Sequence, residues 1–600
     1  MAIDDSLNNN PNNDLPKDKG ELLSYWKEQV RLGCRYKQLY GRSKEWKTYK
    51  NAYRNFFAPN TVPVNIIYAV GRSLVPQIYF RNPRVSIIPK KPGYAMHARV
   101  LERVDNYLIK ELNIKDTMKS EILDCYLCGR GFGILGYDSE YGYNPSFAAT
   151  EILGESTEKT LTQYGSEEQR IEYNLNVKPG MPWFLRCNPN DFIVPWGTYS
   201  WESAPWFAFR KMRLKRDILE DPKYSNTKNI KGLYKSNLDI DGVDGATQTI
   251  QSNSELSNEY IELWEIHDQR SGYVYVVSLD HDDFLRNEFD ELQIEGLNAL
   301  PLGFNEDPDY FWWTPDARLI MQQQYELNDI RTMAKAHRRV ALLKVLYDKG
   351  LVGKEALEKL LDGDPKAAVP IDVGPQGDIR KAVALLQGHI HPDLAMAARE
   401  VREDVREIVG FSRNQMGSFE ESSGRRTAYE AAVVKQASMI RVDERRDICA
   451  DYLEKIIHGM NQIIFKNWTG EKIIDIIGPD GVKYWVRFTG KEIKGDFAYS
   501  IQPEEATPQS QSTRRQEAAA FIPLIQQIPG ANMKYIMETY ASTFDWIDPK
   551  MLFPGEGEGR SPEKAMLMSD LLRKGQAMGQ GGGSPYPALD TGSGLGITGA

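Results

Sequence analysis

Cysteine is scarce and long apolar runs are missing from this chain of 600 residues. Its five cysteines are too few for a disulfide framework and indicate a reducing compartment. The most apolar stretch, residues 66–80, is interrupted by Arg72 and Pro76, so we expect no membrane-spanning helix and no membrane partner. The first residues, MAIDDSLNNN, lack the basic and apolar regions of a secretory signal, and the mean hydropathy of −0.50 favours a soluble protein.

An excess of positive charge is also missing. The chain has 74 Lys and Arg against 83 Asp and Glu, which gives a net charge of −9. That balance disfavours a protein that grips nucleic acid non-specifically, because such binding depends on cationic contacts to phosphates. It remains compatible with a protein past which nucleic acid slides.

Recognisable catalytic motifs are missing as well, because the sequence contains no GxxxxGK[ST], HExxH or GxSxG. GFGILG at residues 131–136 matches GxGxxG, but we expect a helix before it and a strand after it, the reverse of the dinucleotide-binding order. Cys125 and Cys128 form a single CxxC within an apolar helix, which favours buried thiols over a redox or metal site. We therefore expect no enzyme and no cofactor.

Three acidic or histidine-bearing stretches are weak metal candidates. They are Asp239, Asp241 and Asp244 on a Gly-rich turn, residues 280–283 (DHDD), and His389 with His391. The first lacks the bidentate Glu of a calcium loop, and for each a solvated surface turn is the simpler interpretation.

A long helix is the most informative feature that is present. Thr314 can cap it, Pro315 suits its first position, and Asp316 complements the helix dipole. No Gly or Pro follows before Gly350, which permits one helix of about 34 residues, about 50 Å long. Its charges are spread around it and its apolar stripe is partial, so we interpret it as a strut packed sideways on neighbours.

The fold class is α+β. We expect helices within residues 21–58, 61–80 and 95–128, and strands at 84–91, 132–137, 184–196 and 272–279. Seven of the twelve tryptophans lie between residues 183 and 313, which predicts one mixed body there. The polar stretch from about 150 to 260 is expected to be a surface insertion.

The strut is followed by a small α/β unit and then by more helices. Residues 394–409 form a second helix, with near-heptad apolar positions at Leu394, Val401, Val405 and Ile408 and Gly410 at its end. A polar loop (411–426) separates it from a long helix, 427–468, and residues 473–501 are strand-like. Helices return at 510–575, and residues 576–600 form a Gly- and Ser-rich tail.

The order of these segments resembles the portal (head–tail connector) proteins of tailed bacteriophages. The resemblance covers roughly residues 60–500 and depends on several motifs occurring in sequence. They are NIIYAVGRSLVPQIYFRNPRVSIIP, LDCYLCGRGFGILGY, PWFLRCNPNDFIVPW, PDYFWWTPDARLIMQQQYELNDIRT and RTAYEAAVVKQASMIRVDERRD.

The resemblance implies a portal-type fold with an α/β wing, a long helical stem, a small α/β clip and a helical crown. The wing would comprise residues 20–315 and 427–505, the stem helices 316–347 and 391–409, the clip 348–390, the tunnel loop 410–426 and the crown 506–575. Disordered tails are expected at 1–19 and 576–600, and the 150–260 insertion departs from a minimal portal.

It also implies a function. A ring of twelve subunits would stand at one capsid vertex of the virion, after assembly in the host cytoplasm. Double-stranded DNA would pass through it during packaging and ejection. The partners would be the terminase, tail adaptor proteins and the major capsid protein.

Three groups of residues are candidates for these contacts. Tunnel-loop contacts to DNA are assigned to Arg413, Asn414, Gln415, Glu420, Glu421, Arg425 and Arg426. Partner docking on the clip is assigned to Lys354, Glu355, Glu358, Lys359, Asp362 and Asp364. The stem candidates are Arg331, Lys335, Arg338, Arg339, Arg399 and Glu403.

Two other classes of function stay open. One is a different virion structural protein, such as a minor capsid or head–tail adaptor subunit, which a monomer or a ring of other symmetry would favour. The other is an enzyme that uses Cys125 and Cys128 or the Asp239 cluster. Metal analysis and a Cys125→Ser variant would distinguish it.

Overall fold

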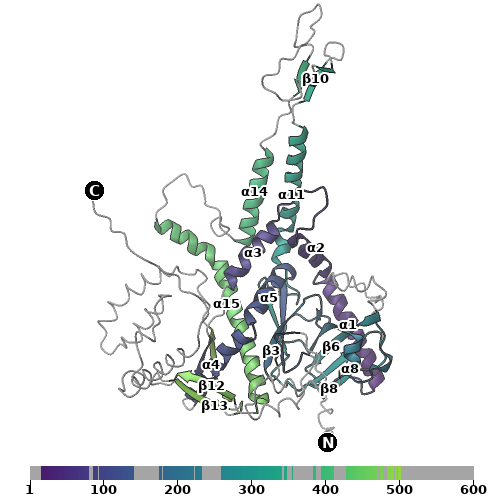
Figure 1. Ribbon diagram of the computed structural model, residues 1–600, viewed down its shortest axis with the longest axis vertical. Helices are drawn as coiled ribbons and strands as arrows, with labels where there is room; N and C mark the ends of the chain where they lie inside the picture. The colour runs from purple at the N-terminus through teal and green to yellow at the C-terminus, as the bar shows by residue number, and fades with distance from the viewer. Residues whose placement is uncertain are drawn as a thin grey trace, which may run out of the picture. The chain divides into compact units, whose positions relative to one another are not determined.

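The computed structural model places helices and antiparallel sheets in one α+β fold (Figure 1). The chain divides into two units, residues 1–474 with 486–506, and residues 475–485 with 507–600. The structure describes residues 15–79, 85–91, 94–140, 174–178, 180–221, 223–232, 258–292, 294–340, 344–347, 354–355, 358, 383–386, 393–410, 428–469, 472–477, 483–488, 490–491, 493–495 and 497–501. The expected crown and both expected tails lie outside these residues, apart from residues 15–19.

A five-stranded antiparallel sheet forms one half of the core. Its strands run in the order β4 (Phe192–Ile193), β5 (Trp206–Leu214), β6 (Tyr260–Asp268), β7 (Tyr273–Val277) and β8 (Arg286–Phe289). β5 and β6 pair along nine residues, from Trp206↔Asp268 to Leu214↔Tyr260. Two short helical segments, α8 (Lys215–Glu220) and η4 (Thr227–Asn229), follow β5.

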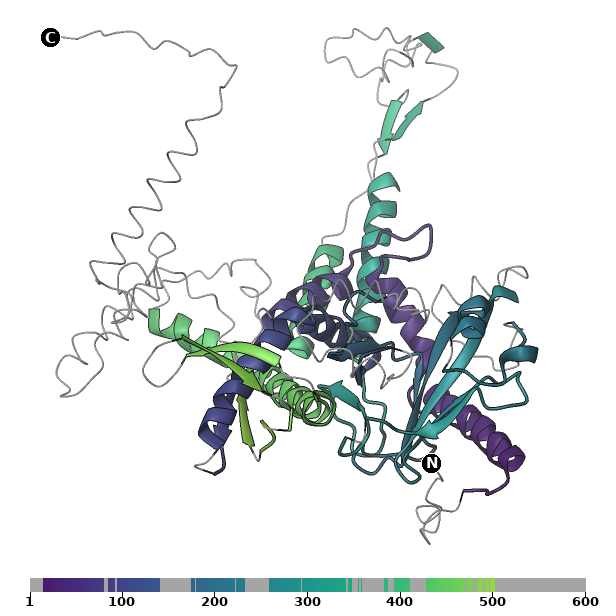
Figure 2. The same ribbon diagram turned by 60° about the horizontal axis from the view of Figure 1, so that its bottom comes forward.

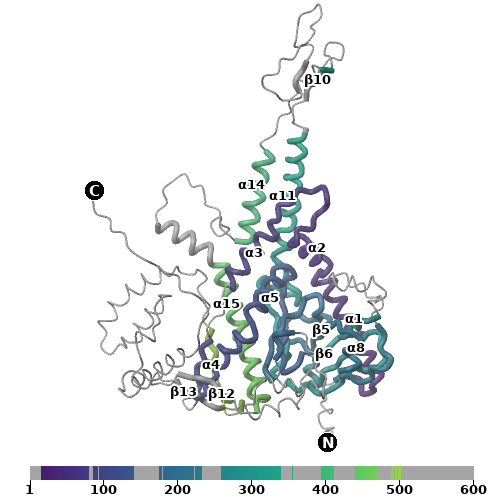
Figure 3. The backbone as a smooth tube through the Cα atoms, viewed as in Figure 1, coloured from purple at the N-terminus to yellow at the C-terminus, as the bar shows by residue number. Residues whose placement is uncertain are grey.

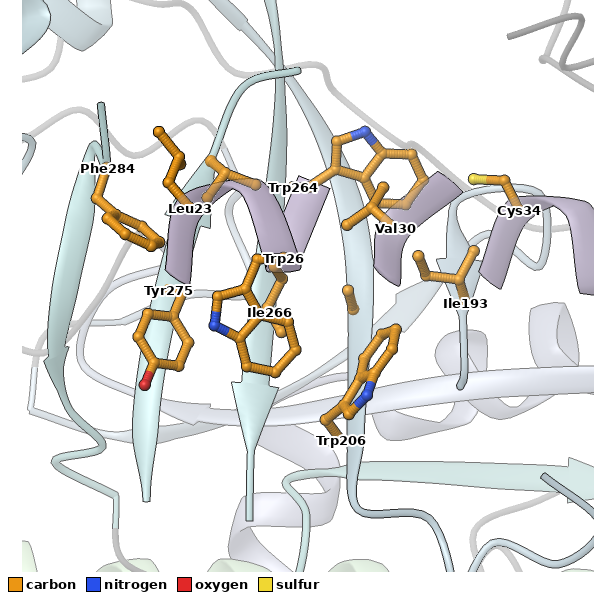
Figure 4. Packing of buried hydrophobic residues seen from close by; sticks show 12 residues of the cluster. Leu23, Trp26, Val30, Cys34, Ile193, Trp206, Trp264, Ile266, Tyr275 and Phe284 are labelled. Atoms are coloured by element: carbon orange, nitrogen blue, oxygen red, sulfur yellow. The ribbon is translucent and has the colours of Figure 1, made fainter. Parts of the chain in front are cut away.

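Helix α1 (Lys19–Leu39) packs against this sheet through its apolar side. It begins where the Asp18 carboxylate accepts hydrogen bonds from the Gly20 and Glu21 backbone N–H groups. Leu23, Trp26, Val30 and Cys34 then recur at helical spacing and are buried on the sheet. Figure 4 shows Trp26 among Trp206, Ile266 and Tyr275, and the Trp26 and Trp206 rings meet edge to face at 5.6 Å.

A three-stranded antiparallel sheet forms the other half, in the order β3 (Pro182–Cys187), β2 (Arg130–Tyr137) and β9 (Ala299–Gly303). Helices α5 (Ile114–Cys128) and α15 (Ala428–Asn467) pack against it. The Phe132 ring of β2 stacks on the Phe192 ring of β4 at 3.9 Å, which joins the two sheets.

The end of the described chain returns to its beginning. β1 (Val85–Pro89) pairs antiparallel with β14 (Phe497–Ile501), from Val85↔Ile501 to Pro89↔Phe497. α4 (Ala95–Glu111) packs beside β1, and α2 (Ser43–Tyr53) and α3 (Ile66–Ile78) pack on α5. α15 packs on α3, and Figure 2 shows α15, in green, beside α4, in dark blue. β12 (Lys472–Ile477) and β13 (Lys483–Phe488) form a separate two-stranded sheet.

Four expectations about secondary structure are wrong in detail. The first strut helix, α11 (Asp316–Val340), ends before residue 347, because Lys344–Tyr347 forms strand β10 and pairs with β11 (Val383–Leu386). The helix expected over 95–128 divides at Asn113, whose φ of 51° is left-handed and tolerated by asparagine. In α14 (Asp393–Val409), Ile408 is only half-buried, and Val409 is buried with Val401 and Val405 instead.

The fourth error concerns the surface insertion expected at about 150–260. Within it, β5 is a central strand of the five-stranded sheet and is mostly buried. Its charged side chains look like surface residues in the sequence, but Arg210 pairs with Asp191, Lys211 with Glu265 and Arg213 with Asp221. The polar pattern therefore reflects buried ion pairs rather than an exposed loop.

Candidate functional site

Helix α11 has two halves with different surroundings. From Asp316 to Ile330 it buries Ala317, Ile320, Met321, Leu327 and Ile330 against α2, α3 and α5. From Arg331 to Arg339 no described residue is buried, and only Thr332 and Ala334 are half-buried. The helix is thus anchored in the body over its first turns and mostly exposed over its last turns. Figure 3 shows these last turns beside α14.

Two buried amides fix the anchored half. The Gln324 side chain accepts hydrogen bonds from the Ile66 and Ile67 backbone N–H groups at 2.8 and 3.3 Å and donates to the Val64 carbonyl at 2.8 Å. The Asn328 side chain, one turn later, accepts from the Val64 N–H at 2.9 Å. Both side chains therefore bind backbone groups at the start of α3 that have no hydrogen-bond partner within the helix itself. The sequence shows these residues only as polar positions on a helix, although they share the spacing of its apolar stripe.

Two arginines of α15 connect α11 to α3. The Arg445 guanidinium donates to both carboxylate oxygens of Asp316, at 3.1 and 2.8 Å, and both side chains are largely buried. Arg446 donates through Nε and Nη2 to the Gln77 carbonyl near the end of α3. Bidentate geometry fixes orientation, so α15 holds the base of α11 at a defined angle. None of these roles was visible in the sequence beyond the acidic first turn at Asp316.

The second strut helix, α14 (Asp393–Val409), lies beside α11 (Figure 1). Val401, Val405 and Val409 recur every four residues and are buried, which gives α14 one narrow apolar side. The remaining positions from Arg402 to Asp404 are exposed, and Arg399 and Glu403 form an i,i+4 ion pair at 3.4 Å. Arg399 and Glu403, two of the stem candidates, therefore lie on the exposed surface of the helix pair.

The exposed end of α11 is strongly basic. Arg331, Lys335, Arg338 and Arg339 are all exposed, and none forms an ion pair with another residue that the structure describes. The acidic residues Glu326 and Asp329 precede them, so the charge changes sign along the helix. Cations near a helix C-terminus are favoured by the helix dipole, and here they also form a compact surface for an anion.

The clip candidates are placed only in part. β10 follows α11, β11 precedes α14, and the two pair antiparallel from Lys344↔Leu386 to Tyr347↔Val383. Between them, Lys354, Glu355 and Glu358 are helical and exposed. Lys359, Asp362 and Asp364 lie outside the described residues.

The tunnel-loop candidates lie outside the described residues too: Arg413, Asn414, Gln415, Glu420, Glu421, Arg425 and Arg426. The structure does describe both flanks of that loop. Gly410 ends α14 with a φ of +79°, and Arg441 of α15 donates through Nη1 to the Glu407 and Ile408 carbonyls. Arg441 thereby caps the C-terminus of α14 and ties together the two helices that the loop connects.

The enzyme-type candidates have structural roles where they are described. GFGILG lies inside β2, where a Cβ on Gly133 would be 2.0 Å from the Phe184 ring and 2.8 Å from Glu121 Oε1. Cys125 and Cys128 are buried, and burial raises the pKa of Cys128 to about 12 and that of Cys125 well above its usual value. Neither thiol thus favours the thiolate that redox or metal chemistry needs.

The metal candidates gain no support within the described ranges. There, no group of three His, Cys, Asp or Glu side chains is placed to hold a metal ion. The His281 ring lies 2.9 Å from the Asn226 carbonyl, which is a structural contact. Asp239, Asp241, Asp244, His389 and His391 lie outside the described residues.

A groove of about 480 Å³ lies between β3, β5 and the start of α5. Its basic side chains are already matched with acids: Arg186 binds both carboxylate oxygens of Asp124, and Arg210 and Lys211 pair with Asp191 and Glu265. The Arg186–Asp124 pair holds β3 to α5, and the other two pairs hold β5 to Asp191 and to β6, so these charges have structural partners.

Comparison with known proteins gives no assignment. No family model matches the sequence, and no curated protein matches it either. Among the helices that the structure describes, none is both long enough and apolar enough to cross a bilayer.

Proposed function

We propose that this chain is the portal protein of a tailed bacteriophage, forming a ring at one capsid vertex through which the genome enters and leaves. The observation that supports the proposal is a segment that leaves the body and returns to it, formed by α11, β10, β11 and α14 and called the excursion below. α11 leaves the body, β10 and β11 pair beyond α11, and α14 returns beside α11. α15 and β14 then complete the same body that the early helices began.

The surface of the excursion supports assembly of several copies. Two helices with one shared narrow apolar contact leave most of their sides exposed, which is unusual for a stable isolated hairpin. A two-stranded sheet is also marginal by itself. Copies arranged head to tail around an axis would cover these surfaces, and such heterologous contacts form a ring when the rotation closes.

The charge distribution supports passage of DNA rather than tight binding. The protein is acidic overall, with a net charge of −9, while the end of α11 carries an isolated basic cluster. Most of the affinity for DNA comes from phosphate contacts, so few cations in an acidic conduit allow sliding. The terminase, tail adaptors and the major capsid protein are the proposed partners, and the clip is the proposed docking site for the first two.

Negative-stain imaging of the purified full chain tests the proposal. The expected result is end-on views of a ring with a central hole, from which the number of subunits is counted. A lone globular particle at micromolar concentration would contradict the proposal, and a ring whose symmetry differs from twelve would favour another virion structural protein.

A further inference from the structure

Helix α4 exposes one side that combines cations with apolar residues. Met96, Arg99, Arg103, Tyr107 and Lys110 are all exposed, and at 3.6 residues per turn they fall within an arc of about 80°. Met96 and Tyr107 are each 47% exposed. Arg99 and Lys110 form no ion pair with another described residue. We call this surface the α4 stripe.

Helix α15 exposes a side of the opposite charge. Ile440, Glu444, Asp447 and Asp451 are exposed and fall within an arc of about 60°. Ile440 is 65% exposed. The three carboxylates have no ion pair with another residue in the described part of the chain. We call this surface the α15 stripe.

The two stripes match in spacing as well as in charge. Counting from Met96, the next members of the α4 stripe follow three, seven and eleven residues later, at Arg99, Arg103 and Tyr107. Counting from Ile440, the members of the α15 stripe follow four, seven and eleven residues later. A parallel alignment therefore places Met96 near Ile440, two arginines near two carboxylates, and the Tyr107 hydroxyl near Asp451.

The stripes do not pair within one chain. Within the same chain these helices meet through a buried hydrogen bond, which Asn461 of α15 donates to Asp105 of α4 at 2.9 Å. Asp105 lies on the side of α4 opposite the α4 stripe, because nine residues separate it from Met96, two and a half turns. The α4 stripe thus faces away from the α15 of its own chain (Figure 1 labels both helices).

We propose that the α4 stripe of one copy docks on the α15 stripe of a second copy of this chain. The inference rests on the multi-copy assembly proposed above and names one interface of it. Opposite charges at matching spacing fix the register of such a contact and disfavour incorrect partners. The apolar ends, Met96 and Ile440, add burial that nucleic acid would not provide, which favours a protein surface as the occupant.

A charge-swap experiment on the full chain tests the pairing. Arg99→Glu and Glu444→Arg, made singly, are each expected to weaken self-association about tenfold or more, because each places like charges in contact. The double variant restores the attraction and is expected to recover most of the wild-type association, measured by sedimentation. Lys228→Glu, an exposed cation after β5, is the matched control and is expected to have no effect.

If both single variants associate like the wild type, or if the double variant fails to recover, the pairing is wrong. A ring that persists in images of these variants would overturn the interface and leave the portal proposal intact.

Cysteine crosslinking gives a second readout, in which misfolding of a variant cannot be mistaken for loss of the interface. All five native cysteines are buried, so Met96→Cys with Ile440→Cys supplies the reactive thiols for a short bismaleimide. A ladder of dimers, trimers and larger species supports head-to-tail docking. Dimers alone support the interface but contradict the ring. A crosslink confined within single chains, or none in assembled protein, overturns the inference.

Discussion

At the scale of single residues, buried polar groups determine how the elements meet. Gln324 and Asn328 lie on the same side of α11 as Ile320 and Leu327, and their partners are backbone groups at residues 64–67, more than two hundred positions earlier. The sequence predicts the helix and its periodicity but not this role, because an amide on a helix is usually solvated. The only sign of this role in the sequence is that Gln324 and Asn328 share the helical spacing of the apolar residues.

Gln324→Ala is expected to destabilise the protein by about 2–3 kcal/mol, because two buried backbone N–H groups and the part-buried Val64 carbonyl lose their partner. Chemical denaturation measures the decrease in the free energy of unfolding. Gln322→Ala, on an exposed position of the same helix, is the matched control and should change stability little. Equal effects of the two variants would contradict the role assigned to Gln324.

A pH dependence follows from Asp105. Burial raises the pKa of this carboxyl from 3.8 to about 8; the Asn461 hydrogen bond opposes the rise, and the nearby Glu102 carboxylate adds to it. The native state therefore holds a proton that the unfolded state releases. Stability from this group is complete below about pH 4 and falls as the pH rises from 4 to 8.

Asp105→Asn should flatten this dependence, with a gain on the order of 2 kcal/mol at pH 8 relative to the wild type. Denaturation midpoints at pH 5, 6.5 and 8 measure the effect, with Asp309→Asn as an exposed control. A slope that is the same in Asp105→Asn as in the wild type would rule out the buried proton.

At the scale of elements, the sequence predicts where helices lie better than it predicts where they end. The periodic stretches predicted α1, α11, α14 and α15, and the C-terminal Gly410 was placed correctly. The end of α11 was not, because Lys344–Tyr347 becomes a strand only by pairing with residues nearly forty positions later. β5 was missed for a similar reason, since its cations are neutralised by acids on other elements.

The basic end of α11 carries the prediction at this scale. Replacing Lys335, Arg338 and Arg339 together with Gln is expected to weaken the affinity of the assembled protein for double-stranded DNA and to reduce its salt dependence. The slope of log K against log salt should become shallower by about 0.9 for each phosphate that these cations no longer neutralise. The same replacement at three other exposed cations, Arg216, Lys228 and Lys231, is the control.

At the scale of the whole molecule, the candidate sites divide into those that the structure places and those it does not. The stem candidates are all exposed on the helix pair of α11 and α14: Arg331, Lys335, Arg338, Arg339, Arg399 and Glu403. No pattern in the sequence could show that Arg441 joins the two helices flanking the tunnel loop.

Deleting residues 414–423 tests that loop directly. If it contacts DNA in the channel as a gasket or valve, the deletion should leave ring formation unchanged but reduce genome retention in assembled particles. Packaged DNA after nuclease treatment measures retention, and ring formation is followed by imaging. Normal packaging and retention in the deletion variant would count against a role in the channel.

The pairing of β1 with β14 also has a consequence for synthesis. Val85 leaves the ribosome long before Ile501, so the β1 edge and the surfaces of α3, β2 and β3 that α15 covers stay open while some four hundred further residues are translated. Contacts with such large sequence separation form slowly. The nascent chain therefore exposes an unpaired strand edge for most of its translation, and a chaperone that shields this edge would raise the yield of correctly folded protein.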